Sequence, residues 1–152
     1  MDTNRYLTTQ QQEQILQDVI DLFLIPHFMQ LGLDATGEWK ENVKPLGNTI
    51  WGRDYTEQLV HGRAGGSFPP IAPLKKWAMA KFGASDKEAL SIAFAVSNKI
   101  AKFGTNIYQK GGTDLIAILK SDKVVRFINE QTGEFIKNQV TGNMTDYIKK
   151  IF

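Results

Sequence analysis

The chain has two histidines, and imidazole is the side chain most often used as a general base near neutral pH. His61 follows Asp54 by seven residues and Glu57 by four, so a base and a carboxylate could meet for hydrolysis or group transfer. These spacings do not define a site in a loop or a strand, so a small hydrolase using His61 is an alternative function only. His27 follows Pro26 in an apolar segment, and we expect it to be packed or at an interface.

The sequence contains none of the usual metal or phosphate motifs. It has no cysteine, no HExxH, no DxDxDG and no paired histidines, so we predict no intrinsic metal and no cofactor. The glycine-rich string from His61 to Gly66 resembles a phosphate-binding loop, but no Lys-Ser or Lys-Thr pair follows it and no buried strand precedes it. We therefore assign no catalytic residue and expect a protein that is not an enzyme.

The charge balance is nearly neutral, with 18 Lys and Arg against 16 Asp and Glu. A net charge of +2 does not favour a polyanion as the partner. Three lysines, Lys75, Lys76 and Lys81, alternate with Trp77 and Phe82, which could form a nucleic-acid surface. At helical spacing the aromatic side chains belong to the core and the lysines to solvent, so we expect no sequence-specific nucleic-acid binding. A DNA-binding accessory module remains an alternative function.

The length of 152 residues fits one domain with a single core. The longest apolar run, Leu22 to Ile25, is much shorter than the roughly 18 residues of a membrane span. The first residues include Asp2, Arg5 and a glutamine tract where a signal peptide is apolar. We expect no membrane insertion and no conventional secretion.

Residues 1–33 have the pattern of an amphipathic helix. Thr8 or Thr9 can cap it, with a glutamine three residues on as the reciprocal partner. Pro26 removes one amide, so we expect a kink or an early stop near Leu24. The apolar positions exceed one stripe, which suits either a helix that also meets another chain or a fully covered internal helix.

Residues 34–63 carry turn-forming residues between short segments with β-compatible side chains. We predict strands at Glu38 to Val43 and at Thr49 to Trp51, joined by a turn over Lys44 to Asn48. Tyr55 to Val60 fits either a third strand or a helical turn. A small antiparallel sheet follows from this pattern.

Helices are predicted over most of the remaining chain. One begins at Pro73 and ends at Gly83, and a second begins with the Ser85 capping box and ends at Gly104. A short helix over Asp114 to Leu119 precedes the extension 121–152, whose spacing favours helix over two strands. The predicted fold class is α+β and helix-dominated, with helices packed on a small antiparallel sheet. Along the chain we expect an N-terminal helix in 1–33, a core in 34–120 and a helical extension in 121–152.

The segment from Gly62 to Pro70 has the highest density of glycine and proline in the chain. Glycine permits close backbone approach to another surface, and the prolines restrict the exit of the loop. Arg and aromatic side chains are the usual energetic centres of protein interfaces, so Arg63 and Phe68 are the first candidates for contact residues.

Several short motifs follow one another in a fixed order along the chain: Ala35-Thr36-Gly37, Tyr55 to Val60, Gly62-Arg63, Gly66, Phe68-Pro69-Pro70, Leu74 with Trp77, Ala93 to Ile100 and Gly104-Thr105. This order resembles the tail-completion, or head–tail connector, proteins of tailed bacteriophages. The match spans Asp34 to Leu119, about half of the chain. The long first helix and the extension after Ser121 match no part of the family pattern.

This resemblance implies a non-enzymatic virion protein, assembled in the host cytoplasm, that forms a ring at the neck of the particle. Its partners would be copies of itself and other neck, portal or tail proteins, and the genome would pass through the ring lumen. In a cyclic ring each subunit docks one face onto a different face of its neighbour. A monomer with such faces would carry mobile loops, so the resemblance implies that the Gly62 to Pro70 segment and one helix terminus become ordered only on assembly. The expected interface residues are Tyr55, Arg63, Phe68, Pro69 and Pro70.

Overall fold

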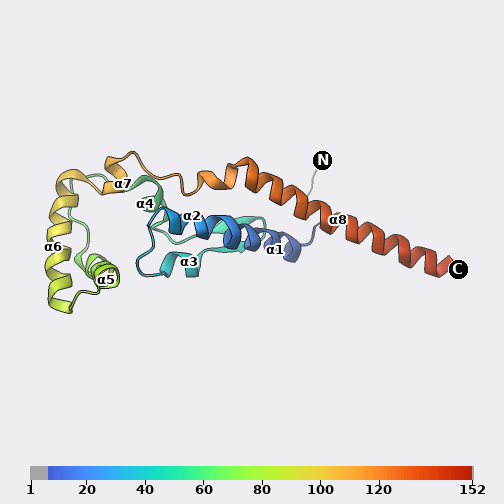
Figure 1. The fold of residues 1–152 in the computed structure, drawn as a ribbon, viewed down its shortest axis with the longest axis horizontal. Coiled ribbons are helices and arrows are strands. Elements are labelled where there is room, and N and C mark those ends of the chain that lie inside the picture. The colour runs from blue at the N-terminus through green and yellow to red at the C-terminus, as the bar shows by residue number, and fades with distance from the viewer. Residues whose placement is uncertain (1–6, 152) are drawn as a thin grey trace. The chain divides into compact units, whose positions relative to one another are not determined.

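The computed structural model describes residues 7–151, so Asp2 and Arg5 lie outside the described residues. The chain forms helices and one pair of strands (Figure 1). It divides into two compact units that interleave along the sequence. Unit 1 contains the chain up to Pro26, Lys44–Trp51 and the chain from Ala117 onward; unit 2 contains His27–Val43 and Gly52–Ile116. The predicted parts 1–33, 34–120 and 121–152 are each continuous along the chain, whereas each of the two observed units is built from segments that are separated in the sequence.

Unit 1 begins with α1 (Thr9–Val19), whose capping box is confirmed: the Thr8 side chain accepts from the Gln11 amide, and the Gln11 side chain accepts from the Thr8 amide. The π-helical turn η2 (Ile20–Leu24) and the helix α2 (Ile25–Gln30) follow directly. The irregular turn ends at Leu24, two residues before Pro26, where the kink was predicted. The chain stays helical to Gln30, however, because the widened turn pairs the Ile25 amide with the Ile20 carbonyl.

The sheet is a two-stranded antiparallel hairpin of β1 (Lys44–Leu46) and β2 (Thr49–Trp51). Pro45 pairs with Ile50, and Gly47 makes the turn with a φ of 60°. α1 packs against β1, and the Gly47 amide donates to the Glu13 carboxylate at 2.8 Å. The predicted second strand is confirmed, and the first one lies in what was predicted to be the turn.

The extension is one helix, α8 (Asp122–Ile151), so the reading as two strands is wrong. Its first turns pack against α1 (Figure 1). Val124 is fully buried there, and the Phe23 and Phe127 rings lie edge to face with centroids 5.2 Å apart. The short helix predicted at Asp114 to Leu119 is a 3₁₀ turn, η3 (Ala117–Lys120), which packs on η2. The core of this unit also contains Ile15, Val19, Ile20 and Leu24.

The largest elements of unit 2 are α5 (Ile71–Phe82) and α6 (Asp86–Phe103), which pack side by side (Figure 1). Both bury small side chains, Ala78 on α5 and Ala89 and Ala93 on α6, and this lets the two backbones approach closely. α5 begins two residues before Pro73, which therefore lies inside the first turn, where a missing amide leaves no bond unmade. The predicted Gly83 stop, the Ser85 capping box and the Gly104 stop are confirmed.

Three short helices complete unit 2: α3 (Glu38–Asn42), α4 (Thr56–His61) and α7 (Asn106–Gln109). The strand predicted at Glu38 to Val43 is wrong, because α3 forms there and directs Trp39 onto Phe28, with ring centroids 4.6 Å apart. The Trp39 indole donates to the Thr56 hydroxyl at 2.8 Å. The open question at Tyr55 to Val60 is resolved as a helix. No helix was predicted at the position of α7.

The fold is helix-dominated with one small antiparallel sheet, in agreement with the α+β expectation at this level. The sheet has two strands and is contacted in its own unit by α1. Among the helices described over residues 7–151, none is long and apolar enough to cross a bilayer.

Candidate assembly interface

The Gly62 to Pro70 loop is fixed by backbone hydrogen bonds to the end of α6 and the start of α7. The Arg63 amide donates to the Thr105 hydroxyl at 3.0 Å, and the Thr105 amide donates back to the Arg63 carbonyl at 2.9 Å. Further along, the Gly66 amide donates to the Ala101 carbonyl at 2.8 Å. These bonds tie Arg63 and Gly66 to the loop's own chain, which argues against the expectation that the loop becomes ordered only on assembly.

Two glycines allow this close approach. A Cβ built on Gly62 would lie 2.3 Å from the Tyr108 amide nitrogen, and one on Gly104 would lie 2.6 Å from the Arg63 carbonyl oxygen. Both residues also have positive φ, 75° and 78°, combined with an extended ψ that essentially only glycine adopts. The Gly62-Arg63 and Gly104-Thr105 pairs are thus two sides of one backbone contact.

We call the Gly62 to Pro70 segment, held by these hydrogen bonds, the pinned loop. It exposes Phe68 to solvent and buries the next residue, Pro69. Phe68 is 68% exposed, the largest exposed fraction among the large apolar side chains that the structure describes. Pro69 is buried, and its carbonyl accepts from the buried Ser97 hydroxyl at 3.2 Å. Pro70 is exposed and precedes the first residue of α5. Pro69 is therefore a core residue of unit 2, which corrects its assignment as a contact residue.

Arg63 is half-buried beside the same loop. Its guanidinium donates to the Ser67 hydroxyl at 3.1 Å. Among the described residues this is its single hydrogen bond, and a guanidinium has five N–H donors. The side chain is held in place by Ser67 and retains donors for a second surface.

Tyr55 lies before α4 and belongs to a different polar cluster, around Glu38. Its phenol is half-buried, and this burial, followed by the nearby Glu38 carboxylate, raises the pKa of Tyr55. Lys76, on α5, forms an ion pair with Glu38, and this contact holds the pKa of Glu38 below its ordinary value. Tyr55 therefore lies near the ion pair between Glu38 on α3 and Lys76 on α5.

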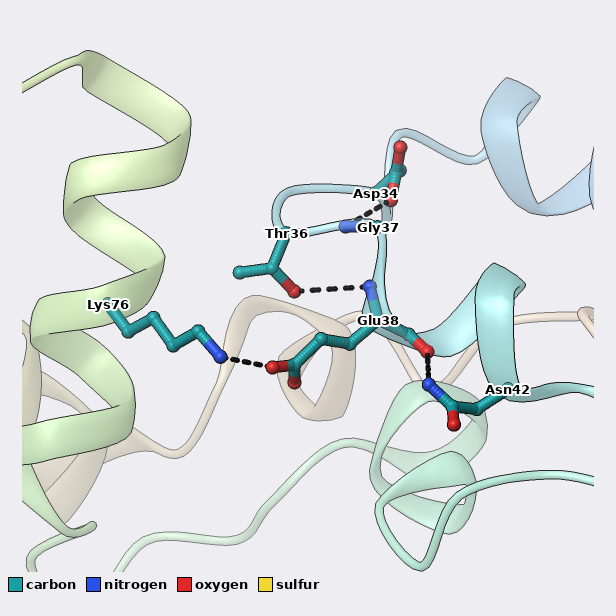
Figure 2. Close-up of polar contacts among 6 residues, drawn as sticks. All are labelled: Asp34, Thr36, Gly37, Glu38, Asn42 and Lys76. Atoms are coloured by element: carbon teal, nitrogen blue, oxygen red, sulfur yellow. Dashed lines mark hydrogen bonds and ion pairs between the residues drawn. The ribbon is translucent and has the colours of Figure 1, made fainter.

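The Ala35-Thr36-Gly37 motif forms the turn that starts α3. Figure 2 shows the Asp34 carboxylate accepting from the Gly37 amide, and the Thr36 hydroxyl accepting from the Glu38 amide. At the other end of α3, the Asn42 side chain donates to the Glu38 carbonyl at 2.7 Å. Gly37 adopts the left-handed backbone conformation, with a φ of 77°, just before the first residue of α3. That first residue is Glu38, whose carboxylate forms the ion pair with Lys76.

The histidines are separate from this interface. In the described part of the chain, His61 is exposed and makes no hydrogen bond or ion pair, so the meeting with Asp54 or Glu57 is not formed. His27 is mostly buried, and its Nε2 lies 3.0 Å from an Asp114 carboxylate oxygen. The sequence could not indicate that pair, since 87 residues separate its members. Across residues 7–151, no three or more metal-ligating side chains gather where an ion could bind.

The lysines of α5 make contacts within the chain. Lys75 forms an ion pair with Asp86 at 2.5 Å, and Lys76 pairs with Glu38. The ammonium of Lys81 lies 5.3 Å from the centre of the Trp77 ring. Phe82, which we expected in the core, is exposed and packs edge to face on Trp77. Two of the three positive charges are thus neutralised by carboxylates of unit 2.

Sequence reasoning missed two exposed aromatic side chains on α6, Phe94 and Phe103. Phe94 precedes Ser97, the residue that holds the loop carbonyl, by one helical turn. The sequence does indicate that Phe94 is exposed, because Phe94 falls outside the buried helix face formed by Ala89, Ala93 and Ile100. An apolar residue off the buried face of a helix indicates a second contact surface.

No family model matches this chain, and neither the curated proteins nor the solved structures contain a match to it.

Proposed function

We propose that this chain is a structural subunit of the neck of a tailed bacteriophage, assembling as a ring in the head–tail connector region and completing the joint to the tail. It has no enzymatic role in this proposal. Its partners are copies of itself and the adjoining neck, portal or tail proteins, with the genome passing through the lumen. The proposal includes the family's fold, in which helices pack on a short sheet.

The observation that carries the proposal is the pinned loop with its exposed Phe68. The loop contains three of the motifs, Gly-Arg, Gly and Phe-Pro-Pro, whose order resembles the connector family. A contact residue on a rigid backbone loses little conformational entropy on docking, so more of its buried area contributes to affinity. Phe68 and Arg63 have the side-chain types of interface hot spots, and both lie on this loop.

The proposal is tested in a phage that lacks its own copy of this gene and is complemented with variants of the chain. Phe68→Ala should lower the yield of complete particles by about tenfold or more, because an aromatic hot spot contributes roughly 2 kcal/mol or more at each interface. The unfolding free energy of the purified variant should stay within about 0.5 kcal/mol of the wild type, as for an exposed residue.

Phe82→Ala is the matched control, since it removes a similarly exposed ring outside the loop. Full particle yield with Phe68→Ala would refute the proposal. The alternative functions have their own signatures: DNA affinity that falls steeply with salt for the accessory module, and turnover abolished by His61→Ala for the hydrolase.

A further inference from the structure

The second half of α8 is a helix whose side chains are exposed throughout. Every residue from Lys137 to Ile151 is exposed, and Figure 1 shows no element of the same unit beside these last turns. Five apolar side chains gather along this half, each between 51% and 66% exposed. We call them the α8 stripe: Val140, Met144, Tyr147, Ile148 and Ile151.

The spacing of the α8 stripe is that of a coiled-coil seam. Val140, Met144, Tyr147 and Ile151 follow one another at intervals of four, three and four residues. These intervals place the four side chains on one face of the helix, at alternating d and a positions of a heptad. Ile148 lies next to the seam and widens it. A seam of this kind fits the same seam on another helix, knob into hole.

This half of α8 also needs a partner to be a stable helix. Isolated helices of about 12 to 15 residues are marginal in water even with alanine-rich sequences. Here Gly142 lies within the helix, and the space around it is open, so no close contact inside the chain requires a glycine there. Val140, Thr141 and Thr145 are β-branched and lower the helix propensity further. The stabilisation must come from burial of the apolar face.

The charges around the stripe favour a second copy as that partner. Thr141 and Asn143, which flank its centre, are uncharged, so two copies can meet there without like-charge repulsion. The charged residues Asp146 and Lys149 fall on the opposite face of the helix, whereas Lys150 lies at the flank of the stripe and Lys137 lies in line with it, before its first member. An anionic membrane surface would instead call for a polar face rich in lysine and arginine, and Asp146 and the several amide and hydroxyl side chains do not provide one.

We propose that the α8 stripe docks against the α8 stripe of a second copy of this chain, forming a short two-helix coiled coil. Two such stripes would together bury on the order of 1,000 Å², which is the lower limit for a specific interface. The contact is therefore expected to be reversible and concentration-dependent. This inference rests on α8 alone and is independent of the neck proposal, which rests on the Gly62 to Pro70 loop.

The test is sedimentation equilibrium of the full chain in three forms. The wild type should associate, and the double variant Met144→Lys/Tyr147→Lys should weaken the association constant by about 100-fold or more, because it places charge in the seam. The control Gln139→Lys/Thr145→Lys adds the same charge on the remaining faces and should change the constant by no more than about threefold. At concentrations low enough to keep all three forms monomeric they should unfold alike, because the stripe is exposed in the single chain.

Two further measurements separate the possible outcomes. Phe68→Ala should leave this association unchanged; if it abolishes association while the seam variant does not, the α8 proposal fails and the neck proposal stands. A wild type that is monomeric at millimolar concentration, or that binds vesicles of anionic lipid through the stripe in preference to itself, would also overturn the α8 proposal. Equal effects of seam and control variants would overturn it as well.

Discussion

Replacing Gly62 by alanine tests how firmly the loop is held. A Cβ at this position would lie 2.3 Å from the Tyr108 amide nitrogen and 2.7 Å from the Tyr108 Cα. Both are backbone atoms, which cannot rotate away as the end of a long side chain can. The φ of 75° and ψ of −172° add strain, because residues other than glycine almost never adopt that combination.

The magnitude follows from these two contributions. The backbone conformation costs about 1–3 kcal/mol for alanine, and forcing a methyl group into a filled space costs about 1–3 kcal/mol more. We therefore expect Gly62→Ala to lower the free energy of unfolding by about 4 kcal/mol, a large share of the total for a domain. Gly83→Ala is the control, because Gly83 has a φ of 62° and open space around it. Its cost should be about 1 kcal/mol, from the left-handed conformation alone.

The assay is equilibrium unfolding in urea followed by tryptophan fluorescence. Two of the three tryptophans, Trp39 and Trp77, lie in the same unit as the loop, so the signal reports on that unit. The expected result is a midpoint shift for Gly62→Ala several times that for Gly83→Ala, at similar slope. Equal shifts for the two variants would refute the reasoning, because they would mean that the backbone contact with Tyr108 can open without cost.

Two further predictions concern titrating groups. Glu38→Gln should lower the pKa of Tyr55 toward its ordinary value without restoring it, because burial, the larger cause, remains; ultraviolet titration of tyrosinate, with Tyr55→Phe as the reference, measures this, and an unchanged pKa would contradict it. The Ser85 amide and hydroxyl lower the pKa of Glu88, so the stability that Glu88 contributes should be fully present above its ordinary value of 4.5 and lost as the pH falls through the lowered value. Unfolding of wild type and Glu88→Gln across this range should converge at the acid end, and a constant difference would contradict it.

The features that the sequence predicted correctly are those set by neighbouring residues. Thr8 and Ser85 cap their helices through side chains three residues away, and Gly83 and Gly104 end theirs through their own backbone conformation. Such signals depend on local chemistry, so they can be interpreted without knowledge of the rest of the chain. The strand β2 was likewise predicted from the β-compatible side chains of Thr49–Trp51 itself.

The errors arose where distant residues decide the structure. Trp39 has a side chain typical of strands, but its packing on Phe28 and its bond to Thr56 stabilise a helix instead.

The predictions for the candidate interface also succeeded where local residues decide and failed where distant residues decide. Phe68 is exposed, as a contact residue must be, whereas Pro69 is buried because Ser97, 28 residues away, binds its carbonyl. The glycines of the loop were correctly associated with a close backbone approach. The surface they approach is the chain's own α6–α7 segment, which spacing along the sequence could not reveal.

The central claim is that copies of this chain form a ring in the neck of a phage particle and contact one another through the pinned loop. Electron cryo-microscopy of the intact particle at side-chain resolution tests it most directly. The account predicts a closed ring of this chain between portal and tail, with Phe68 buried against the neighbouring subunit. A neck without this chain, or a ring in which Phe68 faces solvent, would contradict it.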